Sequence, residues 1–199
     1  GFAVITAQRF GAGSENGVRR SVATSIILGI AVTIVMTAIS VLAARPLLEI
    51  MKTPSDIIDD SYNYIIVIFE GIAAAVFFNL FSSILRSLGD SKTPLYFLIF
   101  SSVLNIILDY VLIKFTHMGV KGAAVATVLA QLLSVILCFV VILKNFKIIR
   151  LKKNDFHFSA SLFKNMMSAG MAMAVMNSIF SIGSIIMQGS INALGEDII

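Results

Sequence analysis

The chain has 199 residues, of which 58% are hydrophobic and only 13% charged, with a formal net charge of +4. Roughly a quarter of the residues of a soluble domain are charged, so a chain this apolar cannot cover a water-facing surface. The composition therefore excludes a soluble globular protein and indicates that lipid surrounds most of the chain. The single cysteine, Cys138, excludes an internal disulfide.

Five stretches of the chain meet the requirement for a membrane-spanning helix. Such a helix needs about 20 mostly apolar residues, because each residue adds about 1.5 Å to a hydrocarbon path of about 30 Å. In chain order the stretches are residues 22–44, 62–85, 95–113, 120–143 and 166–194. Residues 1–7 resemble the end of an earlier helix, and we expect both ends of the chain to be cut edges. The sequence predicts an all-α, polytopic transmembrane helical bundle.

The loops between these stretches differ in charge. Alternate loops, around residues 9–20, 86–94 and 144–164, hold eleven of the 15 Lys and Arg residues. The intervening loops hold the other four and an acidic cluster within residues 49–60. The positive-inside rule places the first group of loops in the cytoplasm. A basic juxtamembrane loop explains residues 144–164, so no nucleic-acid partner is expected.

Two polar residues inside the apolar stretch 95–113 form the main candidate site. Asn105 and Asp109 are four residues apart, so both project from one face of one helix. An ionisable residue at membrane depth is costly and usually faces the interior of the helical bundle. The pair offers oxygen ligands for a small cation such as Na⁺, or a carboxyl group that can hold and release a proton. The alternative is an interhelical hydrogen bond with a structural role.

Other polar residues within the apolar stretches are weaker candidates. Thr127 is the expected third member of the site, because its helix follows after a short loop and should be an antiparallel neighbour. Gln131 lies one turn further on the same face and either lines a cavity or braces helices. Glu70 is a second intramembrane acid, which lines a substrate path or reaches the interface. The scattered amides, Asn79, Gln188 and Asn192, line such a path or hold helices together.

Motifs for soluble enzymes are absent from the sequence. The run G-A-G-S-E-N-G resembles a phosphate-binding loop, but no Lys-Ser/Thr pair follows it. The two histidines, His117 and His157, lie in separate loops and make no metal-binding pattern. No G-x-S-x-G or H-E-x-x-H motif occurs. The sequence predicts a protein that is not an enzyme and that needs no cofactor.

Six stretches of the chain resemble the multidrug and toxic compound extrusion (MATE) family of antiporters. In order, they are A-Q-R-F-G-A-G, M-K-T-P-S-D-I, R-S-L-G-D-S-K-T-P, L-N-I-I-L-D, G-V-K-G-A-A-V-A-T-V-L-A-Q and Q-G-S-I-N-A-L-G. Each stretch alone is weak evidence. Together they follow the family's order and spacing over nearly the whole chain.

The resemblance implies a fold of twelve helices in two lobes that open alternately to either side of the membrane. Residues 1–146 would supply part of helix 2 and helices 3 to 6 of the amino-terminal lobe. Residues 147–164 would form a basic cytoplasmic loop between the lobes. Residues 165–199 would form the truncated first helix of the second lobe. Helix 1 and the rest of the second lobe would be partners from the same protein.

The resemblance also implies a cation site formed by an Asn, an Asp and a Thr, which match Asn105, Asp109 and Thr127. It implies a multi-pass protein of the plasma (inner) membrane, coupled to Na⁺ or H⁺, that exports small amphipathic or cationic compounds. The family often has prolines where this chain has Ala73 and Ala172. Their absence removes kinks, which argues against bending of these helices.

Two alternative functions remain open at this point. One is a lipid-linked oligosaccharide or polysaccharide flippase of the same superfamily, which would use a more basic central cavity. Lys and Arg are absent from the interiors of the apolar stretches, which argues against a flippase. The other is a non-transporting membrane scaffold.

Overall fold

The computed structural model describes residues 2–50, 58–115, 118–157 and 159–193, apart from the side chains of residues 60, 153, 154, 185 and 188–193. These residues form helices and no strands. In chain order the elements are α1 (Phe2–Gly11), α2 (Glu15–Ile50), α3 (Ile58–Glu70), α4 (Ile72–Ser87), α5 (Lys92–Phe115), α6 (Gly119–Asn145), the 3-10 turns η1 (Lys147–Ile149) and η2 (Lys153–Phe156), and α7 (Ala160–Ala193). The predicted all-α class is confirmed.

Five stretches of the described residues are long and apolar enough to cross a membrane. They are Glu15–Ile50, Ser61–Ser87, Lys92–Phe115, Gly119–Asn145 and Ala160–Ser184. Each overlaps one of the five stretches predicted from the sequence, so the prediction of a polytopic bundle is confirmed.

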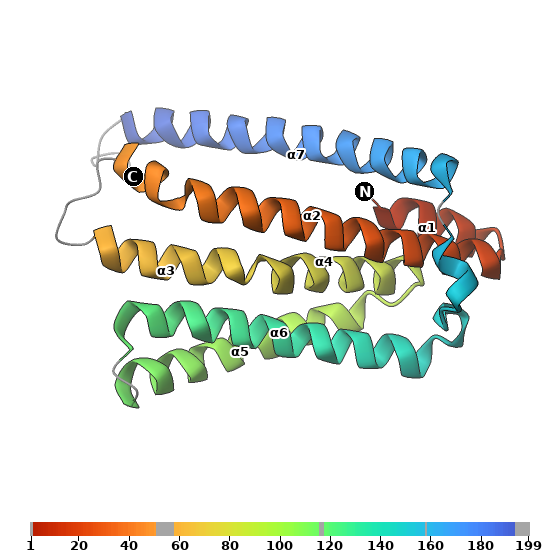
Figure 1. Cartoon of the computed structure of the whole chain (residues 1–199), viewed down its shortest axis with the longest axis horizontal. Coiled ribbons are helices and arrows are strands. Elements are labelled where there is room, and N and C mark those ends of the chain that lie inside the picture. Colours follow the sequence, from red (N-terminus) through yellow and green to blue (C-terminus); the bar gives the residue numbers. More distant parts are fainter. Residues whose placement is uncertain (1, 51–57, 116–117, 158, 194–199) are drawn as a thin grey trace.

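The helices α2 to α6 run side by side, and successive spans alternate in direction (Figure 1). The α1–α2 turn, the α4–α5 turn and the two 3-10 turns all lie at one end of the bundle. We call this the basic end, because it carries the three loop regions rich in Lys and Arg, around residues 9–20, 86–94 and 144–159. The alternation of charged loops in the sequence thus matches the alternation of spans in space.

The main apolar core lies toward the basic end and joins α2, α4, α6 and η1. Its buried members are Val18, Val22, Leu80, Phe81, Ile84, Leu85, Leu88, Cys138, Ile142 and Ile149. Cys138 is fully buried here, in agreement with a role as a small packing residue. Elsewhere large apolar side chains point outward, such as Ile106, which is 68% exposed. Exposed apolar surface of this extent is expected for a bundle surrounded by lipid.

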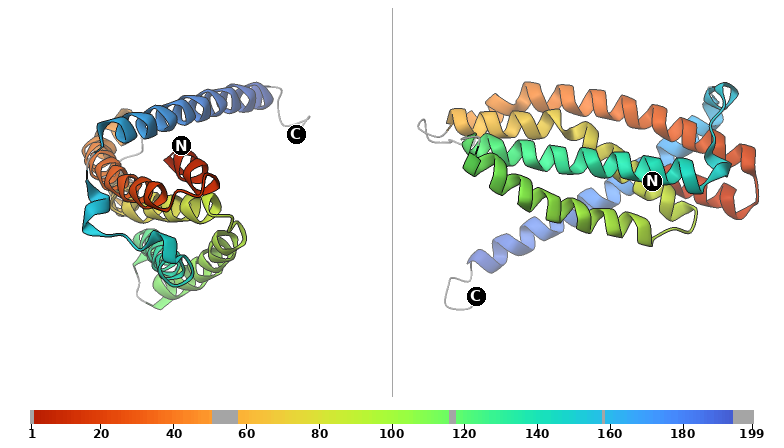
Figure 2. Two further views of the ribbon diagram at one scale, coloured as in Figure 1. Left: turned by 90° about the vertical axis from the view of Figure 1, so that its right-hand side faces the viewer. Right: turned by 90° about the horizontal axis from the view of Figure 1, so that it is seen from below.

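Helix α7 diverges from the other spans (Figure 2). Near its start, Leu162 and Met166 are buried with Leu28 of α2. Gly170 lies so close to α1 that a Cβ built on it would be 2.6 Å from Cε1 of Phe2. Beyond this point, every residue from 171 to 180 is exposed. Only the first part of α7 therefore packs on the rest of the described chain.

The structure corrects three boundaries expected from the sequence. Helix α2 continues through Arg45 and Pro46 to Ile50, instead of ending at residue 44. An ion pair of 3.7 Å between Arg45 and Glu49, one turn apart, supports this last part of the helix. Helix α7 starts at Ala160, six residues before the predicted apolar stretch 166–194.

The third correction concerns Gly71, where the predicted helix 62–85 is divided into α3 and α4. The carbonyl oxygen of Gly71 accepts hydrogen bonds from the N–H groups of both Ala74 (3.0 Å) and Ala75 (3.4 Å). Residues 61–87 still form one membrane span, and the expectation that the missing proline at Ala73 disfavours bending stays a prediction. Glycine weakens a helix by about 1 kcal/mol relative to alanine, so an interruption here does not need a proline.

The turns at the basic end depend on glycine and on a helix cap. Gly13 and Gly89 have φ values of +70° and +90°, which L side chains rarely adopt. Asp90 accepts a hydrogen bond of 3.0 Å from the N–H of Thr93 and so caps the start of α5. Partial burial acts to raise the pKa of Asp90, but hydrogen bonds from Thr93 and from the Lys92 backbone outweigh it and lower the pKa. The Asp90 carboxylate is therefore well satisfied by the protein.

Candidate functional site

The pair of helices α5 and α6 holds the candidate site, and small residues allow their close approach. Ser134 of α6 donates a hydrogen bond to the Phe97 carbonyl of α5 (3.3 Å) and also to the Ala130 carbonyl of its own helix (3.1 Å). Toward the other end, a Cβ on Gly122 would lie 3.4 Å from the backbone of Leu112. The predicted pairing of these two helices is therefore confirmed.

Asn105 and Thr127 meet between the two helices. The amide nitrogen of Asn105 donates a hydrogen bond to the Thr127 hydroxyl at 3.2 Å. The Thr127 hydroxyl in turn donates to the Ala123 carbonyl at 3.0 Å. Thr127 thus makes the back-bond expected of any threonine in a membrane helix and also contacts the partner helix. In this arrangement, the Asn105 amide oxygen and the second lone pair of the hydroxyl remain available as acceptors.

Asp109 lies one helical turn beyond Asn105 on α5. Its Oδ1 atom is buried and has no hydrogen-bond partner among the described residues. A buried acceptor without a partner is unfavourable, and the cost is larger for a charged group. A bound proton or cation would relieve that cost. The described residues hold no cluster of three His, Cys, Asp or Glu side chains that would suit a tightly held metal ion.

A small cavity of about 160 Å³ opens beside this pair of helices. Asn105, Thr127 and Gln131 all line it. The structure thus brings together three of the polar residues singled out in the sequence, with Asp109 one turn away on α5. Sequence reasoning missed Ser101, which is buried and lines the same cavity. Ser101, Asn105 and Asp109 follow one another at intervals of four residues, so they share one face of the helix. This spacing could have identified Ser101 from the sequence.

The other predicted candidates lie elsewhere. Glu70 is exposed at the end of α3 and lines none of the described cavities. Asn79 is exposed on α4, donates a hydrogen bond to the Ala75 carbonyl (2.8 Å), and borders two other cavities of about 330 and 380 Å³. The Gln188 and Asn192 side chains lie outside the described residues.

Gly71 positions α6 next to the candidate site, and the sequence analysis did not identify this role. A Cβ built on Gly71 would lie 2.3 Å from Cγ2 of Val128, the residue that follows Thr127. A side chain at position 71 would fit only if Val128 repacked or α6 moved. The interruption between α3 and α4 therefore occurs where Gly71 lies close to the helix that carries Thr127.

Comparisons with known proteins agree with this architecture. The MatE family model matches residues 1–111. The chain is 30% identical to the probable multidrug resistance protein YpnP of Bacillus subtilis, over 98% of this chain and 43% of that protein. It is 31% identical to the probable multidrug resistance protein NorM of Thermotoga maritima, over 92% of this chain and 40% of that protein. The chain thus spans less than half the length of these relatives.

Solved structures of MATE proteins have the same arrangement of helices. A crystal structure of MATE in the bent conformation aligns with a TM-score of 0.84 and 25% identity, over 92% of this chain and 41% of that chain. The inward-facing conformation of a MATE family multidrug resistance transporter aligns with a TM-score of 0.79 and 26% identity, over 85% of this chain and 39% of that chain. From the family match and the shared helical architecture, we conclude that the chain belongs to the MatE family of multidrug efflux transporters.

Proposed function

We propose that the protein is a secondary active transporter in which Na⁺ or H⁺ entry drives the export of small amphipathic or cationic compounds. Asp109 would bind the coupling ion, with Asn105 and Thr127 as additional ligands or hydrogen-bond partners. The observation that supports this most directly is the buried Oδ1 of Asp109, which lacks a partner among the described residues. Related proteins are named as multidrug resistance proteins.

An ion at Asp109 can drive transport only if it binds one conformation of the protein more tightly than another. Asn105 and Thr127 lie on different helices, so a change in the contact between α5 and α6 would change the set of ligands. The hydrogen bond of 3.2 Å between them is of ordinary length, and a cation that takes the amide oxygen need not break it. This arrangement allows the ion to enter and leave without unfolding the site.

We further propose that residues 1–146 belong to an amino-terminal lobe, residues 147–164 form the loop between lobes and residues 165–199 begin a second lobe. The stretch 171–180 of α7 supports this division, because every residue in it is exposed. The second lobe and a further helix would complete the transporter in the plasma membrane. A flippase is less consistent with the chain, since the interiors of its spans carry no Lys or Arg.

The direct test is the Asp109→Asn variant of the full-length protein, measured for efflux of a fluorescent cationic compound with and without an imposed Na⁺ or H⁺ gradient. Ion-driven efflux should fall to background, because the amide cannot carry the charge or the exchangeable proton. Glu70→Gln is the matched control, since it removes the other intramembrane carboxylate, which is exposed. If the Asp109→Asn variant is present in the membrane at normal abundance and its ion-driven efflux is unchanged, Asp109 does not bind the coupling ion.

A further inference from the structure

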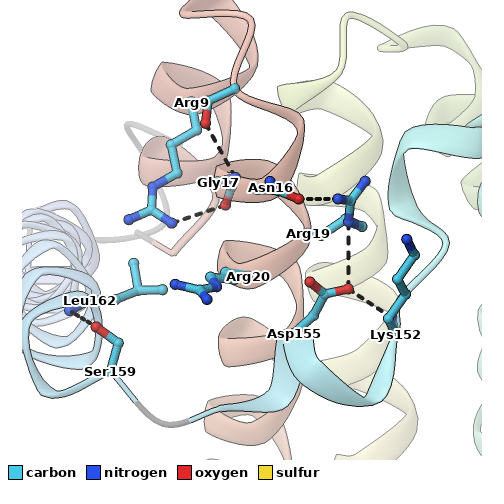
Figure 3. Close-up of a pocket in the computed structure, with 10 residues that line it drawn as sticks. Arg9, Asn16, Gly17, Arg19, Arg20, Lys152, Asp155, Ser159 and Leu162 are labelled. Atoms are coloured by element: carbon cyan, nitrogen blue, oxygen red, sulfur yellow. Dashed lines mark hydrogen bonds and ion pairs between the residues drawn. The ribbon is translucent and has the colours of Figure 1, made fainter.

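A cavity of about 630 Å³ lies at the basic end of the bundle, beside the first residues of α2 (Figure 3). This open cavity is bordered by the α1–α2 hairpin, by η2 and by the start of α7. Four cationic side chains line it, Arg9, Arg19, Arg20 and Lys152, against one acidic side chain, Asp155. None of the residues that line the cavity between α5 and α6 takes part.

Two of the four cations already serve the structure. Arg9 donates a hydrogen bond of 2.9 Å to the Gly17 carbonyl and so ties α1 to the start of α2. Arg19 forms an ion pair with Asp155 (3.5 Å) and contacts Asn16. Asp155 also accepts a hydrogen bond of 2.7 Å from the backbone N–H of Lys152, which closes the η2 turn. These contacts hold the walls of the cavity in place, and the side chains that line it keep an excess of positive charge.

The other two cations, Arg20 and Lys152, have no such structural contact within the cavity. Among the residues drawn in Figure 3, no hydrogen bond or ion pair reaches the guanidinium group of Arg20 or the ammonium group of Lys152. Both side chains belong to exposed residues. Figure 3 shows them on either side of Asp155, one from α2 and one from the residue before η2. Arg20 and Lys152 thus present positive charge to the cavity from two different segments of the chain.

Other features raise the positive potential of this cavity. Burial and the nearby charge of Arg20 lower the pKa of Arg9, which indicates that the cations repel one another. Ser14 and Ser159 also line the cavity. Their hydroxyl oxygens accept hydrogen bonds from the first turns of α2 (3.3 Å) and α7 (3.5 Å), so two helix starts adjoin the cavity. The start of a helix carries a partial positive charge, which adds to that of the side chains.

We propose that this cavity binds a phosphate-bearing anion, with Arg20 and Lys152 as direct contacts. Arginine and lysine at a membrane interface favour the phosphate groups of anionic lipids. The location of the cavity, at the charged ends of membrane-spanning helices and with Leu162 on its wall, suits a phospholipid headgroup whose chains lie along the bundle. A soluble phosphate ester shares the same recognition chemistry. Either ligand would join the α1–α2 hairpin, η2 and α7, so binding should stabilise the fold.

The test compares two double variants of the full-length protein with the same loss of charge. Arg20→Gln/Lys152→Gln removes the two free cations of the cavity. Lys144→Gln/Arg150→Gln removes two exposed cations of the same end that do not line it. The protein in neutral detergent is titrated with phosphatidylglycerol, phosphatidylcholine, glycerol phosphate or inorganic phosphate. Binding is followed by the shift in thermal unfolding and by native mass spectrometry of retained lipid.

We expect phosphatidylglycerol, but not phosphatidylcholine, to bind the wild type and the Lys144→Gln/Arg150→Gln control. Arg20→Gln/Lys152→Gln should bind about twenty-fivefold more weakly, from a loss of about fivefold for each cation. If inorganic phosphate or glycerol phosphate binds as tightly and with the same dependence, the ligand is a soluble phosphate and the site stands. Lys152→Gln alone provides a second measurement if the double variant does not fold.

Two results would overturn the proposal. One is equal loss of binding in both double variants, which would mean general surface charge rather than a site. The other is no preference of the wild type for any phosphate-bearing anion over phosphatidylcholine, which would mean that other parts of the full-length protein fill the cavity. Neither result depends on efflux, so the proposed transport function is tested separately.

Discussion

Asp155 at the basic end and Asp109 at membrane depth are both buried or partly buried carboxylates, but their neighbours differ. Asp155 accepts a hydrogen bond from the Lys152 backbone (2.7 Å) and pairs with Arg19 (3.5 Å). Asp90, also at the basic end, accepts a hydrogen bond from the Thr93 backbone (3.0 Å). The Oδ1 atom of Asp109 has no such partner within the described residues.

The comparison teaches that the contacts around a carboxylate, rather than its burial alone, indicate its role. A carboxylate satisfied by N–H groups and a guanidinium holds two segments together and has little capacity for another ligand. A buried carboxylate oxygen without a donor is unfavourable unless a proton or cation occupies it. The basic end has the opposite imbalance, with more cations than anions in its cavity, and so favours an anion. The two proposals thus assign one chain two sites of opposite charge preference.

The largest effect on stability should come from breaking the contact that holds η2 against α2. Asp155→Asn removes the buried one of the two carboxylates that pair with Arg19, whose side chain is 15% exposed, and leaves only the exposed Glu15 at 3.8 Å. Removal of one member of such a pair should lower the free energy of unfolding by about 2–4 kcal/mol. The measurement is unfolding of the full-length protein in detergent.

Glu49→Gln is the matched control for Asp155→Asn. It breaks the ion pair between Glu49 and Arg45. Their side chains are 63% and 61% exposed, respectively. The expected change in unfolding free energy is below about 0.5 kcal/mol, because exposed ion pairs contribute little. Equal effects of the two substitutions would contradict the view that Asp155 is committed to the structure.

The next effect tests how the membrane-depth site is positioned. Gly71→Ala places a Cβ 2.3 Å from Val128, so α6 must move or its side chains must repack. Overpacking of this kind should cost about 1–3 kcal/mol in thermal or denaturant unfolding and should weaken ion-driven efflux. Gly183→Ala on α7 is the control, because nothing lies within 4 Å of the added Cβ. A tolerated Gly71→Ala with normal efflux would show that this close approach does not position Thr127.

A smaller effect concerns the hydrogen bond between Asn105 and Thr127. A double-mutant cycle with Asn105→Ala and Thr127→Ala should give a coupling energy of about 0.6 kcal/mol, typical of hydrogen bonds between membrane helices. A weak bond is what a site needs if a cation is to enter and leave. A coupling energy several times larger would favour a purely structural role for the pair and weaken the comparison with Asp155.

The smallest effect is the pH dependence at Asp90. Its pKa in the folded protein is lowered, so its contribution to stability is present above the unfolded pKa of about 3.9 and is lost as the pH falls through the folded value. Asp90→Asn should remove this dependence and cost only about 0.3 kcal/mol at neutral pH, because asparagine also caps helices well. Unfolding measured at neutral pH and below pH 4 checks this, and identical pH profiles for both proteins would contradict it.

The sequence alone determined the number of spans, their alternation and the helix that carries the candidate cation site. In a lipid environment these features can be read from short stretches of sequence. A span must be about 20 apolar residues long, and a polar residue within it is easily recognised. The apolar stretches 95–113 and 120–143 accordingly lie within α5 and α6. Asn105, Asp109 and Thr127 were found by the same contrast.

Only the tertiary structure decided which polar groups have partners. It paired Asn105 with Thr127, left Oδ1 of Asp109 without a donor and set Gly71 against Val128. It also brought Arg20 and Lys152, which lie far apart in the chain, to the lining of one basic cavity. The physical reason is that hydrogen bonds, close contacts and summed charge depend on neighbours in space, which the composition and spacing of one segment do not specify.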